Sequence, residues 1–362
     1  MAHLFVDISS HGFGHLGQAA PVLTALCQRL PNLRLTVRCG LSRHILAARL
    51  PEGFGHIREA SDFGYVMKDA ISIDHDASRT AYRAFHADFA GRIAREAEFL
   101  QRLKPDLVLT DVAYLPLAGA KRADIPAIAM SSLNWLDLAR HFYGEEAWAA
   151  PIIAHLQAAY EGADAFIQLT PAMPMETLPN RRLVGPVARV ASAEARSRLR
   201  DLLKIGADQT LVLVAMGGFD LNLPTDRWPT DPLLRYLMPA TWDCDHPNAI
   251  AYAQNEFDFT ELLRASDAVL TKPGYGTVAE AACNGVPMLY VRRDDWPEQD
   301  ALMAWLHQVG RCREVKRENL DSGAWIDNLQ ALLAEPIRPP VMPRGIKEAV
   351  DVITGKLFSS SN

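Results

Sequence analysis

The sequence predicts an α/β protein built from two units with parallel sheets, and three observations predict this class. Short apolar runs alternate with stretches of helical periodicity along most of the 362 residues, as in parallel strands joined by helical crossovers. A proline-rich, aperiodic stretch at residues 171–191 divides the chain. Glycine-rich segments follow predicted strands in both halves, at the place where open α/β sheets bind ligands.

The first half contains five predicted strands separated by predicted helices. The strands are expected at residues 4–8, 33–39, 106–110, 127–130 and 165–169. Helices are expected at residues 18–30, 41–50, 78–103 and 114–123, with further helical stretches to about residue 160. The helix at 78–103 has the clearest pattern, because its apolar residues recur every three or four positions. Residues 51–76 show no interpretable periodicity.

The second half repeats this α/β pattern without repeating the sequence. Strands are expected at residues 211–215, 249–253, 268–270 and 288–291, and helices at 192–203, 259–265, 277–284, 299–309 and 325–333. Four prolines between residues 336 and 343 precede a last helix at 346–357. We therefore expect domains at residues 1–180 and 181–345, and a C-terminal helix, 346–362, that crosses back to the first domain.

Composition excludes several classes of protein. The chain has 37 basic and 43 acidic residues, a net charge of −6 and a pI near 6.0, so no nucleic-acid partner is expected from charge. Five scattered cysteines without a C-x-x-C pair argue for free thiols rather than a disulfide framework or a zinc ribbon. No apolar run approaches the ~18 residues of a membrane span, and no signal peptide precedes the first strand. We expect a cytoplasmic protein, with peripheral membrane contact left open.

The loop between the first strand and the first helix is the first candidate site. Gly12 and Gly14 allow the backbone to turn sharply and to approach a ligand closely. His11 and His15 can transfer protons near neutral pH. Asp111 ends a neighbouring strand, where it either orients a histidine or caps the following turn.

Two other interpretations of this loop stay open. Gly12, Gly14 and Gly17 match the dinucleotide fingerprint G-x-G-x-x-G, but the acidic residue expected after the second strand is absent. Arg38 and Arg43 would suit the 2′-phosphate of NADP instead. In the second interpretation, the loop is only a tight turn, and its two histidines have a structural role.

A second candidate site lies at residues 271–280, between a predicted strand and a predicted helix. A helix N-terminus supplies unpaired N–H groups and partial positive charge, which suit a phosphate. Glu280 can accept hydrogen bonds from two ribose hydroxyls, or it can cap the helix at Thr277, three residues earlier. The candidate binding residues are Lys272, Gly274, Tyr275, Gly276, Thr277 and Glu280.

Two more polar loops follow strands of the second half. Gly217 and Gly218 directly follow the strand at 211–215 and allow close approach of a diphosphate, or they form an ordinary turn. Residues 292–300 include Arg293, Asp294 and Gln299 and form either part of the site or a solvated charged loop. The sequence has no P-loop, no G-x-S-x-G and no H-E-x-x-H motif.

The combination resembles nucleotide-sugar glycosyltransferases of the GT-B fold, in which two Rossmann-like domains face each other across a cleft. It is similar to the N-acetylglucosaminyltransferases of peptidoglycan synthesis and to the glycosyltransferase-like N-terminal half of plant L-arabinokinases. The resemblance rests on Gly12-Phe13-Gly14-His15, Pro105-Asp106-Leu107-Val108, Ala163-Asp164, Ser266-Asp267, residues 272–281 and Val291-Arg292-Arg293-Asp294.

The resemblance implies roles for individual residues. It implies that the backbone at Gly276 and Thr277 binds the donor diphosphate, Glu280 binds the ribose, and the main chain at Phe257 contacts the base. Gln299 would contact the donor sugar, and His15 would deprotonate the acceptor. Related proteins often carry arginine where this chain has Gln18, so the acceptor is left open.

The leading hypothesis is therefore transfer of a sugar from a nucleotide-diphosphate sugar, expected to be UDP-linked, to an acceptor hydroxyl. The helix terminus can hold the leaving diphosphate, so neither a metal nor another cofactor is expected. The alternatives are a nucleotide-sugar hydrolase or epimerase, a non-catalytic sugar-nucleotide binding module, and an NADP-dependent oxidoreductase.

Overall fold

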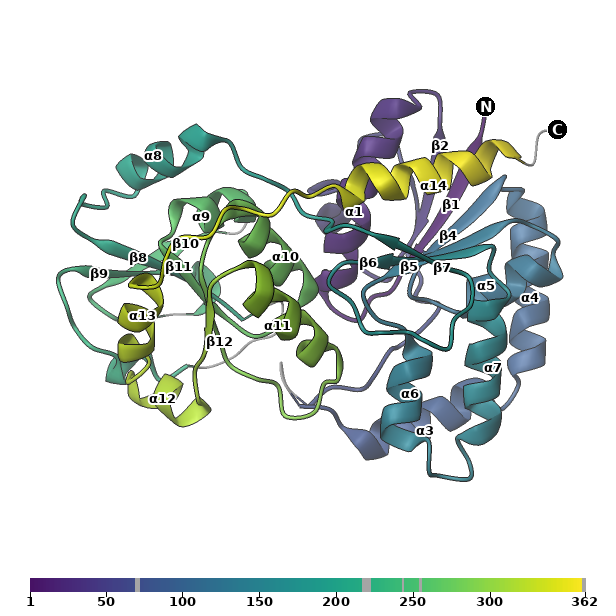
Figure 1. Ribbon diagram of the computed structural model, residues 1–362. Helices are drawn as coiled ribbons and strands as arrows, with labels where there is room; N and C mark the ends of the chain where they lie inside the picture. Colours follow the sequence, from purple (N-terminus) through teal and green to yellow (C-terminus); the bar gives the residue numbers. More distant parts are fainter. Residues whose placement is uncertain (69–71, 217–222, 243, 254–255, 360–362) are drawn as a thin grey trace. The chain divides into compact units, whose positions relative to one another are not determined.

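The computed structural model describes residues 1–68, 72–216, 223–242, 244–253 and 256–359. The chain divides into two compact units (Figure 1). The first unit comprises residues 1–67, 73–187 and 344–362, and the second comprises residues 68–72 and 188–343. The predicted α/β class with parallel sheets is confirmed in both units.

The first unit is built on a parallel sheet that, among the described residues, has seven strands in the order β3-β2-β1-β4-β5-β6-β7. The strands are β1 (His3–Ile8), β2 (Arg34–Arg38), β3 (Gly55–Ile57), β4 (Leu107–Asp111), β5 (Ala127–Ser131), β6 (Ala165–Leu169) and β7 (Arg181–Val184). The helices are α1 (Phe13–Arg29), α2 (Arg43–Ala47), α3 (His75–His86), α4 (Phe89–Leu103), α5 (Leu115–Arg122), α6 (Trp135–Tyr143), α7 (Ala150–Glu161) and α14 (Gly345–Ser359).

The second unit has a parallel sheet in the order β10-β9-β8-β11-β12-β13, counted over the residues that the structure describes. The strands are β8 (Thr210–Ala215), β9 (Leu234–Pro239), β10 (Ala249–Tyr252), β11 (Ala268–Thr271), β12 (Met288–Tyr290) and β13 (Cys312–Glu314). The helices are α8 (Ala193–Leu202), α9 (Phe259–Ala265), α10 (Tyr275–Asn284), α11 (Glu298–Val309), α12 (Arg317–Ser322) and α13 (Ile326–Leu333), with 3-10 turns at Thr225–Arg227 and Ala240–Trp242.

Both sheets reverse their strand order at one point, as Rossmann-type sheets do. In the first unit the chain moves outward from β1 to β2 and β3, and then returns to place β4 on the other side of β1. In the second unit β8 and β11 have the same relation. Because ligands of open α/β sheets bind at the carboxyl ends of the strands beside such a reversal, these two strand pairs locate the candidate sites.

Several predicted elements differ from the structure. The helix predicted at residues 78–103 is two helices, α3 and α4, because the Asp88 carboxylate accepts a hydrogen bond from the backbone of Gly91 and starts a new helix. The helix predicted at 41–50 is only the short α2. The strands β3, β7, β9 and β13 had no prediction. Because β7 pairs with β6, the first unit extends beyond residue 180, to Val187.

An aspartate precedes a strand at three places and fastens it to its neighbour. The aspartate carboxylate accepts a hydrogen bond from the backbone N–H of one residue at the start of the adjacent strand. The backbone N–H of the aspartate donates to the carbonyl of this partner residue. Asp106 bonds to His3 of β1, Asp164 to Ala127 of β5 and Asp267 to Leu211 of β8, at oxygen–nitrogen distances of 2.7, 2.9 and 2.8 Å. These pairs align the amino ends of the strands.

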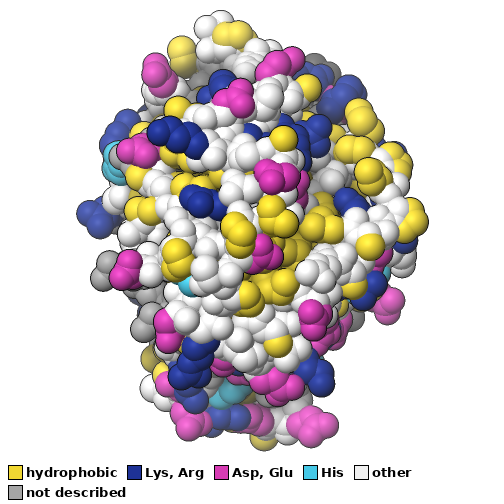
Figure 2. Space-filling model, turned by 90° about the vertical axis from the view of Figure 1, so that its left-hand side faces the viewer, with side chains coloured by type: hydrophobic (Ala, Val, Ile, Leu, Met, Phe, Trp, Pro, Cys, Tyr) yellow, Lys and Arg dark blue, Asp and Glu magenta, His cyan; other side chains and the backbone are white. Residues whose placement is uncertain are grey.

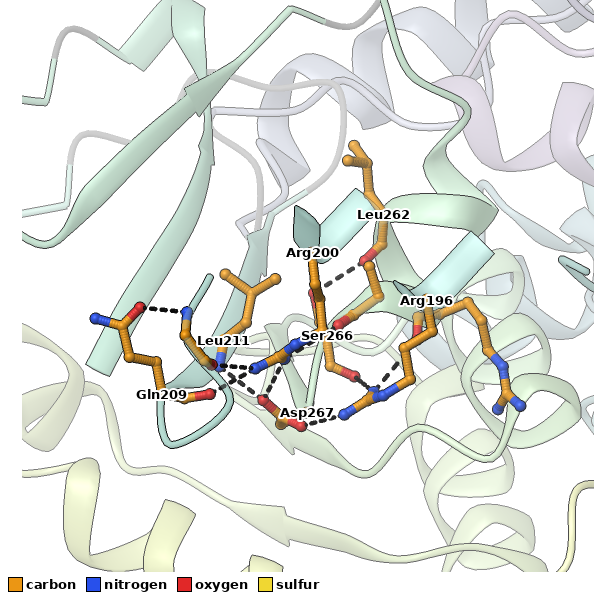
Figure 3. Close-up of polar contacts among 10 residues, drawn as sticks. Arg196, Arg200, Gln209, Leu211, Leu262, Ser266 and Asp267 are labelled. Carbon is orange, nitrogen blue, oxygen red and sulfur yellow. Dashed lines mark hydrogen bonds and ion pairs between the residues drawn. The ribbon is translucent and has the colours of Figure 1, made fainter. Parts of the chain in front are cut away.

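Asp267 also fastens a helix to the second sheet (Figure 3). Its carboxylate accepts hydrogen bonds from Arg196 at 2.5 Å and from Arg200 at 3.0 Å, both on α8. Arg200 donates further to the carbonyl of Gln209 at 2.7 Å. The Ser266-Asp267 pair therefore has a structural role, at the end of the sheet opposite to the candidate site.

The C-terminal helix α14 belongs to the first unit, where it lies alongside α1 (Figure 1). Asp351 of α14 pairs with Arg29 of α1, and Lys356 pairs with Asp164 at 2.5 Å. The Glu348 carboxylate accepts a hydrogen bond from the N–H of Gly185 at 2.6 Å. The chain therefore leaves the first unit after Val187 and re-enters it at Arg344.

Other expectations concern the surface and the cysteines. All five cysteines are free thiols, as predicted. Figure 2 shows lysine and arginine side chains interspersed with acidic ones on the face that it presents. Among the described helices, none is both long and apolar enough to cross a membrane. No cluster of three or more potential metal ligands occurs among the described residues.

Candidate functional site

A buried histidine–aspartate pair lies where the strand order of the first sheet reverses. His15 is in the first turn of α1, which follows β1, and Asp111 is the last residue of β4. The distance between His15 Nδ1 and Asp111 Oδ1 is 2.7 Å, and the two side chains are only 6% and 1% exposed. A carboxylate accepts the Nδ1 proton, so this contact places the basic lone pair of the imidazole on Nε2.

The histidine loop needs its first glycine for backbone reasons. Gly12 is the N-cap of α1 and has φ 85° and ψ 177°, a region that is open almost only to glycine. Gly14 differs, because a Cβ built there would meet no atom within 4 Å. Of the two glycines predicted to matter in this loop, Gly12 is thus required by the turn, whereas at Gly14 the described residues leave room for a side chain.

His11 and Gln18, the other predicted residues of this loop, have different environments. The His11 ring lies 6.4 Å from the His15 ring and 5.4 Å from the indole of Trp135. The Gln18 amide is 2% exposed and bonds to Ser131 and Ser132 at the end of β5. Gln18 therefore ties α1 to the sheet.

Arg38, which suited an NADP phosphate, is held by carboxylates. It is 4% exposed, hydrogen-bonds Asp7 at 2.5 Å and forms a two-pronged contact with Glu96 at 2.6 and 3.0 Å. Arg43 donates to the carbonyl of Phe54 at 3.2 Å and lies over the ring of the same residue. The buried Arg38 guanidinium is thus bound by carboxylates of the protein, which weakens the NADP hypothesis, whereas Arg43 is exposed.

The second candidate site is the start of α10, directly after β11. The helix begins at Tyr275 with Gly274 as its N-cap, and no side chain caps it. Thr277 lies inside the first turn, so the predicted alternative that Glu280 caps the helix at Thr277 is wrong. A Cβ built at Gly274 or Gly276 would meet no atom within 4 Å. Among the described residues, the two glycines at the start of α10 therefore leave room where side chains would otherwise stand.

Two cations and one carboxylate lie beside this helix start. Burial, together with the positive charge of Arg293, lowers the pKa of Lys272 to about 8, while the charge of Glu298 acts in the opposite direction. The Arg293 guanidinium stacks on the Trp296 ring, with its central carbon 4.0 Å from the ring centroid. The Trp296 indole donates to Glu298 at 3.0 Å. An anion bound here would favour the charged form of Lys272.

Gln299, which the resemblance assigns to the donor sugar, binds the protein's own backbone. Its amide oxygen accepts from the N–H of Arg293 at 2.9 Å, and its amide nitrogen donates to the Arg293 carbonyl at 3.0 Å. The side chain is 4% exposed. Gln299 therefore fixes the position of Arg293.

Glu280 lies on α10, where its side chain is 13% exposed. Its Oε1 is 3.7 Å from Nε of Arg189, whose other end pairs with Asp258 at 2.6 Å. Phe257 is half-buried just before Asp258, which caps α9. Glu280, Arg189 and Asp258, which follows Phe257, thus form one connected group against the second half of α10.

The remaining predicted residues contribute less. Asp294 is exposed in the loop after β12. Gly217 and Gly218 lie outside the described residues. Three residues had no functional prediction but adjoin predicted site residues: Asp62 and Trp135 lie near His15, and Trp296 lies against Arg293. Residues 51–76 gave no periodic signal, which is why Asp62 was missed.

Comparison with known proteins identifies the fold. No protein-family model matches the chain. The L-arabinokinase of Arabidopsis thaliana is 27% identical over 332 residues, which cover 89% of this chain and 31% of that protein. The chain therefore spans less than a third of the length of this curated relative.

Solved structures match over nearly the whole chain. The calicheamicin glycosyltransferase CalG4 matches with a TM-score of 0.67 and 18% identity, covering 99% of this chain and 98% of that one. A Listeria monocytogenes protein assigned as a UDP-N-acetylglucosamine 2-epimerase matches with a TM-score of 0.61 and 14% identity, covering 99% and 98%. The chain thus has the GT-B fold of these glycosyltransferases, as the sequence predicted.

Proposed function

We propose that the protein is a metal-independent glycosyltransferase that moves a sugar from a nucleotide diphosphate, expected to be UDP, to an acceptor hydroxyl. The observation that carries the proposal is the buried contact of 2.7 Å between His15 and Asp111 at the reversal of the first sheet. A histidine oriented by a carboxylate is an arrangement suited to removing a proton from a hydroxyl. The first unit supplies this base, and the second unit binds the nucleotide diphosphate.

The transfer balances with the groups present. His15 Nε2 takes the proton of the acceptor hydroxyl as the acceptor oxygen forms a bond to the anomeric carbon. The bond from that carbon to the phosphate oxygen breaks, and its electron pair stays on the diphosphate. The N–H groups at the start of α10 and the charges of Lys272 and Arg293 stabilise this developing negative charge.

Thermal unfolding with a panel of nucleotides tests the donor half of the proposal. UDP at 100 times its Kd should stabilise the protein by about 2.7 kcal/mol. UMP and uridine serve as controls, because they lack part or all of the diphosphate, and should stabilise it less. If no nucleoside diphosphate raises the Tm, the proposal fails.

Transfer to water is the second candidate, favoured by the likeness to the epimerase-assigned protein, which shares the fold. The two activities separate when UDP release from a UDP-sugar is measured with and without a panel of sugar and phenol acceptors. A transferase releases UDP only in proportion to a glycosylated product. Release at the same rate without any acceptor would replace transfer by hydrolysis, and an isomeric UDP-sugar would indicate epimerisation.

A further inference from the structure

Asp62, in the loop between β3 and α3, is buried beside the histidine site. Its side chain accepts two hydrogen bonds: Oδ1 from the hydroxyl of Ser9 at 2.9 Å, and Oδ2 from the indole nitrogen of Trp135 at 2.8 Å. The residue is 7% exposed. A buried carboxylate without a basic partner is costly, and the Ser9 hydroxyl and the Trp135 indole are both neutral donors.

Both neighbours of Asp62 lead to the histidines. The fully buried Trp135 ring meets the His15 ring edge-on, with centroids 5.7 Å apart, and the His11 ring at 5.4 Å. The Ser9 hydroxyl accepts a hydrogen bond from the backbone N–H of His11 at 3.3 Å. Asp62 therefore fixes the two groups against which the histidines rest.

The same loop also packs directly on His11. Gly64 has φ +61°, and a Cβ built there would lie 2.8 Å from two carbons of the His11 ring. The backbone of this loop and the Trp135 indole thus both contact His11. Residues that showed no periodicity in the sequence form a wall of the candidate active site.

The surroundings of Asp62 favour an electrostatic role. The pKa of Asp62 is raised to about 6, mainly by burial and also by the charge of Asp7, while the hydrogen bond from Trp135 and the charge of His15 act in the opposite direction. The ionisable groups that face Asp62 are Asp7 on β1, His15 on α1, Cys39 after β2, Tyr82 on α3, Tyr114 before α5 and Tyr160 on α7. Asp7 is itself paired with Arg38, and His15 is the group in this set whose positive charge stabilises the Asp62 carboxylate.

We propose that Asp62 is a positioning residue for His15: it holds Trp135 against the imidazole and adds a second negative charge behind it, besides that of Asp111. This rests on the proposed role of His15 as the base. A second carboxylate makes the imidazole more basic and stabilises the imidazolium that forms when His15 takes a proton. Trp135 is the rigid link, because its ring contacts His15 while its N–H contacts Asp62.

The test is the titration of His15 in the full-length protein without substrate, followed by NMR of the imidazole nitrogens. Asp62→Asn keeps one oxygen acceptor for Trp135 and removes the charge, while its NH2 group replaces the oxygen that accepts from Ser9. We expect the His15 pKa to fall by about half a unit or more in this variant. Trp135→Phe keeps an aromatic ring but removes the N–H, and should shift the His15 pKa in the same direction by a smaller amount.

Asp137→Asn is the matched control, because Asp137 lies on α6 two residues after Trp135 and is bonded to Asn134 rather than to the indole. A His15 pKa that is unchanged in Asp62→Asn, or that moves equally in Asp137→Asn, would overturn the inference. Should Asp62→Asn fail to fold, an unshifted His15 in Trp135→Phe would overturn it instead.

Turnover distinguishes this inference from the proposed function. If glycosyl transfer is found, the pH profile of kcat/KM should move to lower pH in Asp62→Asn while the KM for the nucleotide sugar stays within about twofold. If no transfer is found, the substrate-free His15 titration still decides whether Asp62 acts on it. If the wild type transfers sugar but the His15 pKa is the same in the wild type and in Asp62→Asn, the role of Asp62 is refuted and the proposed function stands.

The thermal stability of Asp62→Asn provides a further check, because this substitution should raise the Tm although it impairs the proposed base. The folded-state pKa of Asp62 is raised from 3.8 to about 6, so its contribution to stability is present below about pH 4 and is lost as pH rises to about 6. Asp62→Asn, which does not titrate, should therefore gain in Tm relative to the wild type over this range. A variant that loses stability equally at every pH would show a purely structural role.

Discussion

The loop after β1 and the loop after β11 both join a central strand to a helix, but they are equipped differently. In the first, His15 and Asp111 are buried and bonded to each other. In the second, the helix starts without a side-chain cap, two glycines adjoin open space, and Lys272 and Arg293 lie close together. The first loop therefore contains a buried histidine–carboxylate pair, while the second contains two cations, with the carboxylate of Glu298 close to Lys272.

The largest expected effect comes from replacing His15, the proposed base of the first loop. His15→Ala should lower turnover by about 100- to 10,000-fold, the range typical of general acid–base catalysis. The Kd for UDP should stay within about twofold, because His15 belongs to the other unit. Steady-state kinetics and calorimetry measure the two quantities separately.

His44→Ala is the control for the base, since His44 is an exposed histidine of the same unit on α2. Its turnover should equal that of the wild type. A His15→Ala variant with full turnover would remove His15 from the mechanism and leave only the nucleotide site of the proposal.

Lys272→Met tests the anion-binding half. A hydrogen bond from a charged group contributes about 1.5–3 kcal/mol, so the Kd for UDP should rise by roughly 10- to 150-fold. Lys316→Met, at an exposed lysine of the same unit, should leave the Kd unchanged. An unchanged Kd in Lys272→Met would show that the cations at the start of α10 do not contact the diphosphate.

The sequence predicted the fold class, because most of the buried parallel strands produce short apolar runs that alternate with helical patterns, although the inner strand β9 was missed. It also located both loops, since glycines and histidines after a strand are local signals. It failed where short edge strands such as β3 and β13 carry little apolar pattern. It also could not divide the helix at Asp88, because the apolar periodicity continues across that cap.

The interpretation of matching stretches was harder than their detection. Asp106, Asp164 and Asp267 each join two strands at the end of the sheet opposite to the candidate sites. Gln299 binds the backbone of Arg293. Residue type and spacing do not distinguish such framework bonds from ligand contacts, because both use the same polar groups. Asp62 shows the converse, since its partner Trp135 is 73 residues away in the sequence.

Gly12 in the first loop and Gly276 in the second should differ in how much an alanine changes the free energy of unfolding. Gly12→Ala should cost about 1–3 kcal/mol in the free energy of unfolding, because an alanine at φ 85° and ψ 177° is strained. Gly276→Ala should cost nothing and can add up to about 1 kcal/mol, because its new methyl group meets no atom and alanine favours helices. Denaturant unfolding measures both changes.

The affinity for UDP should be affected more by Gly276→Ala than by Gly12→Ala, which is the opposite of their ranking by loss of stability. The methyl group of Gly276→Ala would occupy the space above the first N–H groups of α10, so the Kd for UDP should rise. Gly355→Ala on α14 also meets no atom within 4 Å and controls for the change in helix propensity. Unaltered UDP affinity in a folded Gly276→Ala variant would mean that the phosphates bind elsewhere.

Nucleotide binding should also depend on pH. The pKa of Lys272 is lowered to about 8, first by burial and then by Arg293, and a bound diphosphate should raise it again. Binding therefore takes up a proton above pH 8, and affinity should weaken there by up to about tenfold per pH unit. Calorimetry with UDP between pH 7 and 9.5 measures this slope, and Lys272→Arg should abolish it, because an arginine stays charged throughout the range. If the wild type shows no slope, the ammonium of Lys272 keeps the same protonation with and without nucleotide, and the second loop would hold the anion through its backbone N–H groups rather than through this cation.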